Sequence, residues 1–427
     1  MKETSTDYRH PQRPAPVRLY DTFAGQVPLA RVSLDPEVLL AKARRAEGLQ
    51  DFGPPDPAEP LAVLCRSLQA EAALTPTGRF VQQQRILAAL RARLRLVAWR
   101  AAHPEVATHD VTAPVVISAL QRTGTTLLHR LLAAHPDLRA LRSWEALNPA
   151  PFPRPTWNGS DKRHAFARRA ETVAKYLAPD FFAVHPVDAE APEEDVILLD
   201  QALCSTLPEA TIRTPTYAAW VEARDAEPAY RYLHDALQAL SAQVGPARWV
   251  LKTPHHMEYL DTLLAVFPGA RIVWTHRDPL VAVASFCSMV AHARGLVSDD
   301  IDPEGIGAHW SRKIGRMIDR ALATRDQAPP GTFLDVRYDD LVQDPLGTVH
   351  ALCDALDLPW SPDIEARIEA ARARSPRHQH GKHVYRLADF ALDPAMLAER
   401  FAPYRTRFVL SEGVSDRRPS SGSIRRS

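Results

Sequence analysis

The sequence predicts an α/β protein in which a parallel β-sheet is flanked by helices. Two short runs of apolar and β-branched residues, Val115–Ile117 and Arg271–His276, have the composition of buried strands. Each run is followed by a turn and then by a helical pattern, which begins at Thr125 in one case and at Leu280 in the other. This alternation of strands and helices is typical of a sheet with parallel strands.

The loop between the first predicted strand and its helix favours an anionic ligand. Gly124 permits a tight turn, and Thr125 and Thr126 stand at the start of the helix. Unpaired backbone N–H groups and the positive end of the helix dipole meet there, which favours a phosphate group. The alternative is an ordinary strand–turn–helix junction without a ligand, and the loop by itself leaves that alternative open.

This loop is of the P-loop type but departs from the pattern of nucleotide triphosphatases. That pattern reads G-x-x-x-x-G-K-[ST], in which the Lys contacts the outer phosphates. Here Ala119 takes the place of the first Gly, Thr125 takes the place of the Lys, and Arg122 supplies the positive charge. ATP or GTP chemistry is therefore disfavoured.

A second candidate anion site follows the second predicted strand. Arg277 comes directly after that strand, and Ser285 lies on the next predicted helix. Ligands of open α/β sheets bind at the carboxyl ends of the strands, where both residues would lie. The alternative is that Arg277 pairs with Asp278 or another carboxylate.

These segments together resemble the sulfotransferases that use 3′-phosphoadenosine-5′-phosphosulfate (PAPS). Residues 122–126 match the R-[ST]-G-T-[ST] loop of that family, and the family also has a later strand that ends in an Arg. Residues 249–255 resemble its second strand with a Lys, and residues 333–341 resemble its V-R-Y-E-D-L strand. The similarity spans about residues 111–408 and is greatest to a bacterial branch with W-E, A-P-E-E-D and K-[ST]-P-H-H segments.

The resemblance implies PAPS as the donor and assigns roles to individual residues. The 5′-phosphosulfate would be bound by the loop, and the 3′-phosphate by the residues after the later strand: Arg122, Thr123, Gly124, Thr125 and Thr126 for the former, Arg277 and Ser285 for the latter. Lys252 and Arg122 would stabilise the charge on the leaving oxygen. A basic loop that contains Lys382 weakly resembles a cofactor-binding loop of the family.

A sulfonate transfer of this kind also needs a general base. Glu145, in the W-E segment, lies at about the spacing of the base in the glutamate branch of the family, and we favour it slightly. His185 is the alternative, because an ordinary histidine pKa is better placed for base work at neutral pH. Glu193, Glu194 and Asp195 could be acidic residues at a helix start, and His255 lies close to Lys252.

Composition limits the classes of partner. The chain has 427 residues, a formal net charge of +1 and four cysteines without metal-like spacing. We therefore expect no nucleic-acid partner and no metal. The resemblance implies a small-molecule acceptor. No run approaches the roughly 18 apolar residues of a membrane span, and we expect a cytoplasmic protein. Oligomeric state and the identity of the acceptor are left open.

The chain divides into four parts. We expect a polar arm over residues 1–30, a helical extension over 31–105, an α/β domain over 106–411 and a disordered tail over 412–427. Within the α/β domain, residues 149–246 form a helical, aromatic-rich insertion that would bind the acceptor. The expected function is sulfonate transfer to a hydroxyl or amine. The alternatives are a P-loop-type nucleotide kinase and a nonenzymatic nucleotide-binding scaffold.

Overall fold

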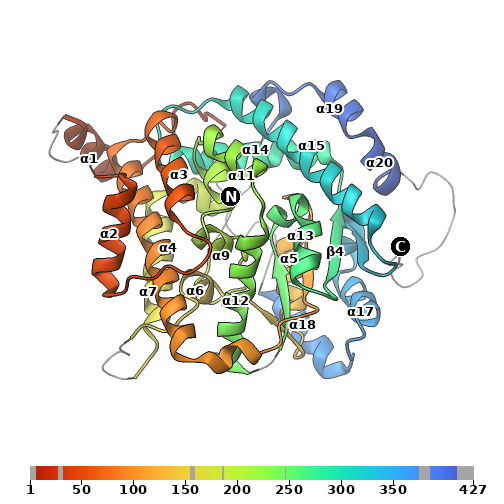
Figure 1. The fold of residues 1–427 in the computed structure, drawn as a ribbon. Helices are drawn as coiled ribbons and strands as arrows, with labels where there is room; N and C mark the ends of the chain where they lie inside the picture. Colours follow the sequence, from red (N-terminus) through yellow and green to blue (C-terminus); the bar gives the residue numbers. More distant parts are fainter. Residues whose placement is uncertain are drawn as a thin grey trace.

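A five-stranded parallel sheet forms the centre of the protein (Figure 1). The computed structural model describes residues 6–26, 32–153, 159–184, 187–245, 247–374 and 385–410. The strand order is β2-β3-β1-β4-β5, and every neighbouring pair is parallel. The strands are β1 (Val115–Ile117), β2 (Leu138–Ala140), β3 (Arg248–Lys252), β4 (Arg271–His276) and β5 (Phe333–Arg337).

Helices cover both faces of this sheet, so the predicted fold class is confirmed. Before the sheet come α1 (Ala15–Gln26), α2 (Pro36–Glu47), α3 (Ala58–Ala70) and α4 (Pro76–Ala102). Between β1 and β3 come α5 (Thr125–Leu132), α6 (Ser143–Leu147), α7 (Lys162–Leu177), α8 (Pro179–Val184), α9 (Val196–Gln201), α10 (Leu207–Thr211), α11 (Pro215–Ala223) and α12 (Glu227–Val244). The later helices are α13 (Leu260–Val266), α14 (Pro279–Gly295), α15 (Pro303–Gln327), α16 (Tyr338–Gln343), α17 (Pro345–Ala355), α18 (Pro362–Ala373), α19 (Pro394–Arg400) and α20 (Ala402–Phe408).

Alternate strand residues point into two hydrophobic cores. Val250 and Val273 pack on one face of the sheet with Leu128 of α5 and with residues of α17 and α18. Trp249 and Trp274 point to the other face and belong to a larger core. This division follows from the pleat of a strand, in which successive side chains point to opposite faces.

The N-terminal helices share the larger core with the sheet. Leu39 of α2, Leu64 of α3 and Leu90 of α4 belong to the same buried cluster as Trp249. In Figure 1 these helices lie on the left, and α17 and α18 lie on the opposite side of the sheet. The extension therefore covers the α/β core and has no separate core of its own among the described residues.

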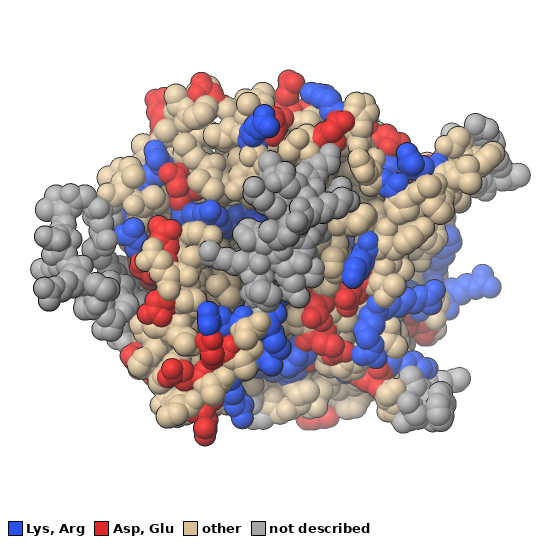
Figure 2. Space-filling model, turned by 180° about the vertical axis from the view of Figure 1, so that it is seen from behind, with Lys and Arg blue, Asp and Glu red and all other residues tan. Residues whose placement is uncertain are grey.

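Acidic and basic side chains are interspersed over the face shown in Figure 2. All four cysteines are buried and unpaired. Within the described ranges, no helix combines the length and the apolar character that a membrane span requires.

Candidate active site

The carboxyl edge of the sheet brings the predicted site segments together. β1 lies between β3 and β4, and Ile117 at its end is in register with Lys252 of β3 and Val273 of β4. The loop after β1, the residues after β3 and Arg277 after β4 therefore leave the same edge. This is the position at which open α/β sheets bind their ligands.

The loop after β1 takes a strained but well-anchored conformation. Arg122 has a φ of 68°, which is uncommon for a residue with a side chain, and Gly124 has a φ of 86°. A Cβ on Gly124 would lie 3.0 Å from Leu341 and 3.3 Å from Tyr338. Only glycine meets both the backbone and the space requirement there. The turn at Gly124 therefore determines where Arg122 and the start of α5 lie.

Thr123 anchors this loop to the sheet. Its side chain is fully buried, and Oγ1 lies 2.7 Å from the carbonyl oxygen of Leu120 and 2.6 Å from Oγ1 of Thr275. The Thr123 hydroxyl, predicted to contact the donor, is thus engaged within the protein. Thr125 and Thr126, at the start of α5, line a cavity instead.

Arg122 and Arg277 form one cationic cluster with Ser285. The Nε atom of Arg122 donates to Oγ of Ser285 at 3.1 Å. Nη1 of Arg277 donates to the carbonyl oxygen of Arg122 at 2.7 Å, and the Arg277 guanidinium stacks 4.1 Å above the ring of Tyr338. The two candidate anion sites of the sequence are therefore adjacent.

Neither arginine of this cluster pairs with a carboxylate of the described residues. Asp278, the neighbour of Arg277, instead caps α14 and pairs with Arg405 at 2.9 Å. Burial lowers the pKa of Arg122, and the nearby charge of Arg277 lowers this pKa further. Two neighbouring cations without a counter-charge favour an anion, which would relieve their mutual repulsion.

A cavity of about 140 Å³ lies beside the loop. Its polar lining comes from the loop with the start of α5, from the segments after β3 and before α9, and from α10 with its N-cap: Gln121, Arg122, Thr125, Thr126, Glu194, Thr206, Thr211, Thr253 and His255. Its apolar lining comes mainly from the insertion and from α14: Phe181, Val196, Leu207, Ala210, Pro254, Phe286 and Met289. An apolar pocket with a few converging polar groups is the usual form of a small-molecule site.

Lys252 and Glu194 form an ion pair at the edge of this cavity. Lys252 ends β3, its side chain is 4% exposed, and Nζ contacts Oε1 of Glu194. The backbone N–H of Lys252 donates to Oδ1 of Asp195 at 2.9 Å. Asp195 also lies 2.7 Å from Nε2 of His256, which ties the start of α9 to the segment after β3.

His255 lines the same cavity, and its side chain is buried. Both of its ring nitrogens are buried and lack a hydrogen-bond partner among the described residues. Burial lowers the pKa of His255 well below its ordinary value, and the charges of His256 and Lys313 act in the same direction. His255 is therefore neutral at pH 7 and can donate one hydrogen bond and accept one.

The structure places Glu145 away from the cavity. Glu145 is buried in α6, where Oε1 pairs with Arg139 and Oε2 accepts the backbone N–H of Arg142 at 2.9 Å. Both carboxylate oxygens are therefore engaged, and Glu145 does not line the cavity. His185 and Lys382 lie outside the described residues, so their predicted roles stay predictions.

Glu194 is the site residue whose position the sequence did not reveal. The sequence suggested only that Glu194 belongs to a group of acidic residues at a helix start. In the structure its carboxylate contacts Lys252, which lies 58 positions further along the chain. The A-P-E-E-D resemblance is the one signal that could have singled it out.

The sheet, the loop and the two neighbouring arginines define an α/β protein with a candidate anion site at a strand–loop–helix junction. The family model described as "Sulfotransferase family" matches residues 114–362. The chain belongs to the sulfotransferase family, as the resemblance implied.

Two solved structures are similar over most of this chain. Sulfotransferase STF1 from Mycobacterium tuberculosis H37Rv is 34% identical with a TM-score of 0.75, and the match covers 86% of this chain and 98% of that one. Sulfotransferase STF9 from Mycobacterium avium is 27% identical with a TM-score of 0.78, and the match covers 87% and 96%.

A curated relative shares a shorter stretch. The omega-hydroxy-beta-dihydromenaquinone-9 sulfotransferase Stf3 of Mycobacterium bovis is 27% identical over 268 residues, and the same figures hold for the protein of that name from Mycobacterium tuberculosis. The match covers 57% of this chain and 63% of that relative.

Proposed function

We propose that the protein is a sulfotransferase that moves a sulfonate group from PAPS to a hydroxyl or amine of an apolar small-molecule acceptor. One observation carries the proposal. Arg122 and Arg277 lie together beside the start of α5, and neither has a carboxylate partner among the described residues. Such a cluster suits a ligand with several phosphate or sulfate groups.

We assign the donor to the loop and the two arginines. Thr125, Thr126 and the N-terminal amides of α5 would hold the phosphosulfate group, and Arg277 with Ser285 would hold the 3′-phosphate. Thr123 would act indirectly, because its hydroxyl holds the loop against Thr275. When bound, PAPS supplies the sulfonate group that is transferred.

Lys252 and Arg122 would stabilise the negative charge of the leaving oxygen. Lys252 is buried at the end of β3, and Arg122 is partly buried on the loop after the neighbouring strand β1. Fixed cations at a partly dry site stabilise developing charge more than they would in water. Positioning and charge of this kind account for most of the catalysis in related group transfers.

We propose that Glu194 is the general base that accepts the proton of the acceptor group. We propose that His255 orients the acceptor. Glu194 lines the cavity and pairs with Lys252, whereas Glu145, the base favoured from the sequence, does not line the cavity. Within the described ranges, neither ring nitrogen of neutral His255 has a partner, so both can serve a hydroxyl or amine. His185 stays a rival candidate for the base.

The apolar wall of the cavity supports an acceptor with an apolar body. Phe181, Phe286 and Met289 contribute to this wall. The relative Stf3 is named for a hydroxylated dihydromenaquinone, which is an acceptor of this kind.

The donor assignment can be tested by thermal shift with 3′,5′-adenosine diphosphate (PAP) and, separately, with ATP plus magnesium. We expect stabilisation by PAP alone, because the loop lacks the Lys of nucleotide triphosphatases. Stabilisation by ATP with magnesium but not by PAP would favour a kinase. Screening of hydroxylated apolar acceptors with labelled PAPS then tests transfer, and PAP binding without any transfer would favour a scaffold.

A further inference from the structure

In the described part of the chain, half of the exposed large apolar side chains lie on two helices. The described residues include twelve such side chains, and six of them belong to α1 or α7. They are Leu19, Tyr20 and Phe23 of α1 and Phe166, Val173 and Tyr176 of α7, each between 40% and 62% exposed. Exposed apolar groups that gather in this way mark an interaction surface.

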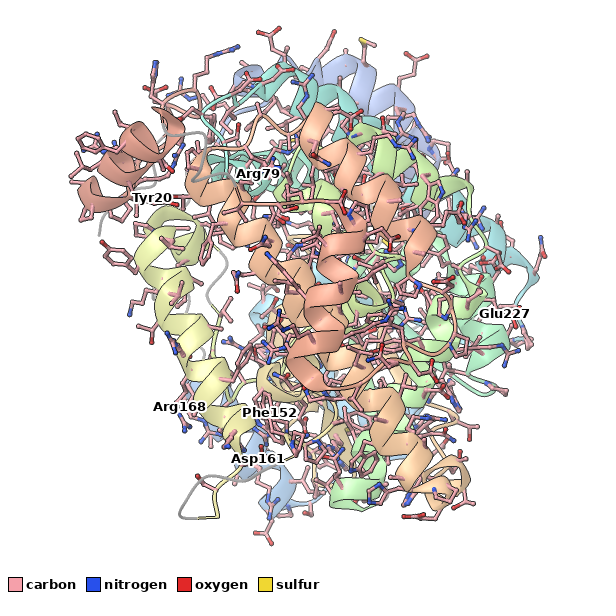
Figure 3. All side chains as sticks on the ribbon, turned by 60° about the vertical axis from the view of Figure 1, so that its left-hand side comes forward. Tyr20, Arg79, Phe152, Asp161, Arg168 and Glu227 are labelled. Atoms are coloured by element: carbon pink, nitrogen blue, oxygen red, sulfur yellow. The ribbon has the colours of Figure 1, made fainter. Side chains whose placement is uncertain are left out.

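The two helices lie at the same edge of the protein. Figure 1 shows α1 and α7 on the left, and Figure 3 shows α1 above the end of α7 with Tyr20 between them. The arm that leads into α1 lies near the end of α7 as well, because a small cavity is lined both by Leu177 and Ala178 and by residues of the arm: Asp7, Tyr8, His10, Pro11 and Gln12. We call this edge the α1–α7 face.

Each helix has a buried side that fixes its orientation. On α1, Val17 is buried and Asp21 accepts the backbone N–H of Thr77 at 2.7 Å. On α7, Ala167 packs beside Trp144, and Arg163 stacks 4.6 Å from the same ring. The apolar residues of the α1–α7 face therefore point outward from helices that are already anchored.

The exposed charges on these two helices are all positive. They belong to Arg18, Arg168, Arg169 and Lys175, of which Arg168 pairs with Glu190 at 3.0 Å. The single acidic residue of each helix is directed inward: Asp21 pairs with Arg13 at 2.9 Å, and Glu171 accepts the backbone N–H of Ala189 at 3.0 Å. In Figure 2, where this edge is on the right, blue side chains predominate along it.

The chain continues from this face to the wall of the cavity. α8 follows α7 after Ala178, and Phe181 of α8 is part of the apolar wall of the cavity. The neighbouring Phe182 lies 5.6 Å from Nζ of Lys175 on α7. A molecule held at the α1–α7 face would therefore be close to the apolar side of the cavity.

We propose that the α1–α7 face docks the protein on an anionic lipid surface. Amphipathic helices with aromatic and aliphatic residues on the outer side, flanked by Arg and Lys, lie in the interface of a bilayer. The basic residues are attracted to anionic headgroups, and the apolar residues enter the boundary of the acyl chains. The placement would present an apolar acceptor to the cavity at the lipid surface.

Cosedimentation with vesicles tests the docking without any transfer reaction. We expect the protein to bind phosphatidylcholine vesicles that contain phosphatidylglycerol, to bind pure phosphatidylcholine vesicles more weakly, and to lose binding as salt rises. Because PAP binding is measured separately, failure of the docking and failure of the proposed function are distinguishable.

Two sets of variants locate the docking surface. We expect Phe166→Ser with Val173→Ser to weaken vesicle binding by about tenfold, and Arg169→Gln with Lys175→Gln to weaken it on anionic vesicles alone. The matched control is Val244→Ser with Met396→Ser, two exposed apolar residues on α12 and α19. Circular dichroism and the melting temperature establish that each variant is folded.

Three results would overturn the proposal. The first is a wild-type protein that does not bind anionic vesicles, and the second is equal loss of binding in the control variant. The third is a dimer in light scattering that the Phe166→Ser, Val173→Ser variant dissociates, because a second copy would then cover this face.

Discussion

The Arg277 guanidinium donates to the backbone carbonyl oxygen of Arg122 at a distance of 2.7 Å. The residue predicted to bind the 3′-phosphate therefore also holds the loop predicted to bind the phosphosulfate. Arg122 reaches back toward the same region, since its Nε donates to Ser285. Loss of the Arg277 side chain would thus have two effects: it would remove a positive charge, and it would remove a hydrogen bond that holds the loop after β1.

The first prediction concerns Arg277→Ala. We expect the affinity for PAP to fall by about 10- to 150-fold, because one charge-assisted contact contributes about 1.5–3 kcal/mol. Calorimetric titration measures this change. Arg271→Ala is the matched control, because Arg271 lies at the other end of β4 and bonds to the carbonyl oxygen of Ala355. Equal affinity in the wild type and Arg277→Ala would remove the 3′-phosphate assignment.

The second prediction concerns the general base. Glu194→Gln keeps the shape of the side chain but cannot accept the proton, so we expect kcat to fall by roughly 10²–10⁴ while PAP affinity is retained. Glu145→Gln is expected to lower stability, through the contacts with Arg139 and Arg142, more than turnover. Transfer assays and melting curves on both variants separate the two effects.

A parallel measurement on His185→Asn completes this test. A large loss of turnover in that variant, with Glu194→Gln close to wild type, would move the base to His185. A large loss in Glu145→Gln alone would restore the assignment made from the sequence.

The third prediction concerns metals. We expect transfer to continue in the presence of a chelator, because the loop has no Lys-[ST] pair for a nucleotide-bound magnesium ion. Among the described residues, moreover, no three His, Cys, Asp or Glu side chains form a group that could bind a metal. Activity is measured with EDTA and after addition of magnesium. Activity that returns only with magnesium would point to the kinase alternative.

The fourth prediction concerns the stability of the fold in acid, to which Asp335 of the edge strand β5 contributes. Burial would raise the pKa of Asp335, but hydrogen bonds from His276 and Arg325 outweigh burial and lower it to about 2. Because the folded pKa lies below the unfolded value of 3.8, this carboxylate stabilises the fold above about pH 4, and the stabilisation is lost as the pH falls toward 2.

Denaturant unfolding between neutral pH and pH 2 measures this contribution. We expect Asp335→Asn to be less stable than wild type at neutral pH by about 1–3 kcal/mol and to show a smaller decrease in acid. An exposed carboxylate provides the control: Asp326→Asn, whose partner Arg407 is also exposed, should behave like wild type. An unchanged acid profile in Asp335→Asn would contradict the assignment.

The sequence by itself determined the elements whose signal is local. β1, β4 and α14 were predictable because a short apolar run or a helical pattern is contained in a few neighbouring residues. The family followed from motifs in a fixed order and is confirmed by the match over residues 114–362. The last strand shows the limit of local patterns: resemblance extended it to Leu341, but β5 ends at Arg337 and Tyr338 begins α16.

Only the tertiary structure decided which side chains meet. Glu145 has a plausible spacing for a base, yet the fold turns it toward Arg139 and away from the cavity. Glu194 looked like part of an acidic helix start, and the insertion brings it to Lys252 at the end of β3. These outcomes depend on how segments far apart in the chain pack together, and spacing along one chain does not encode the direction in which a side chain points after packing.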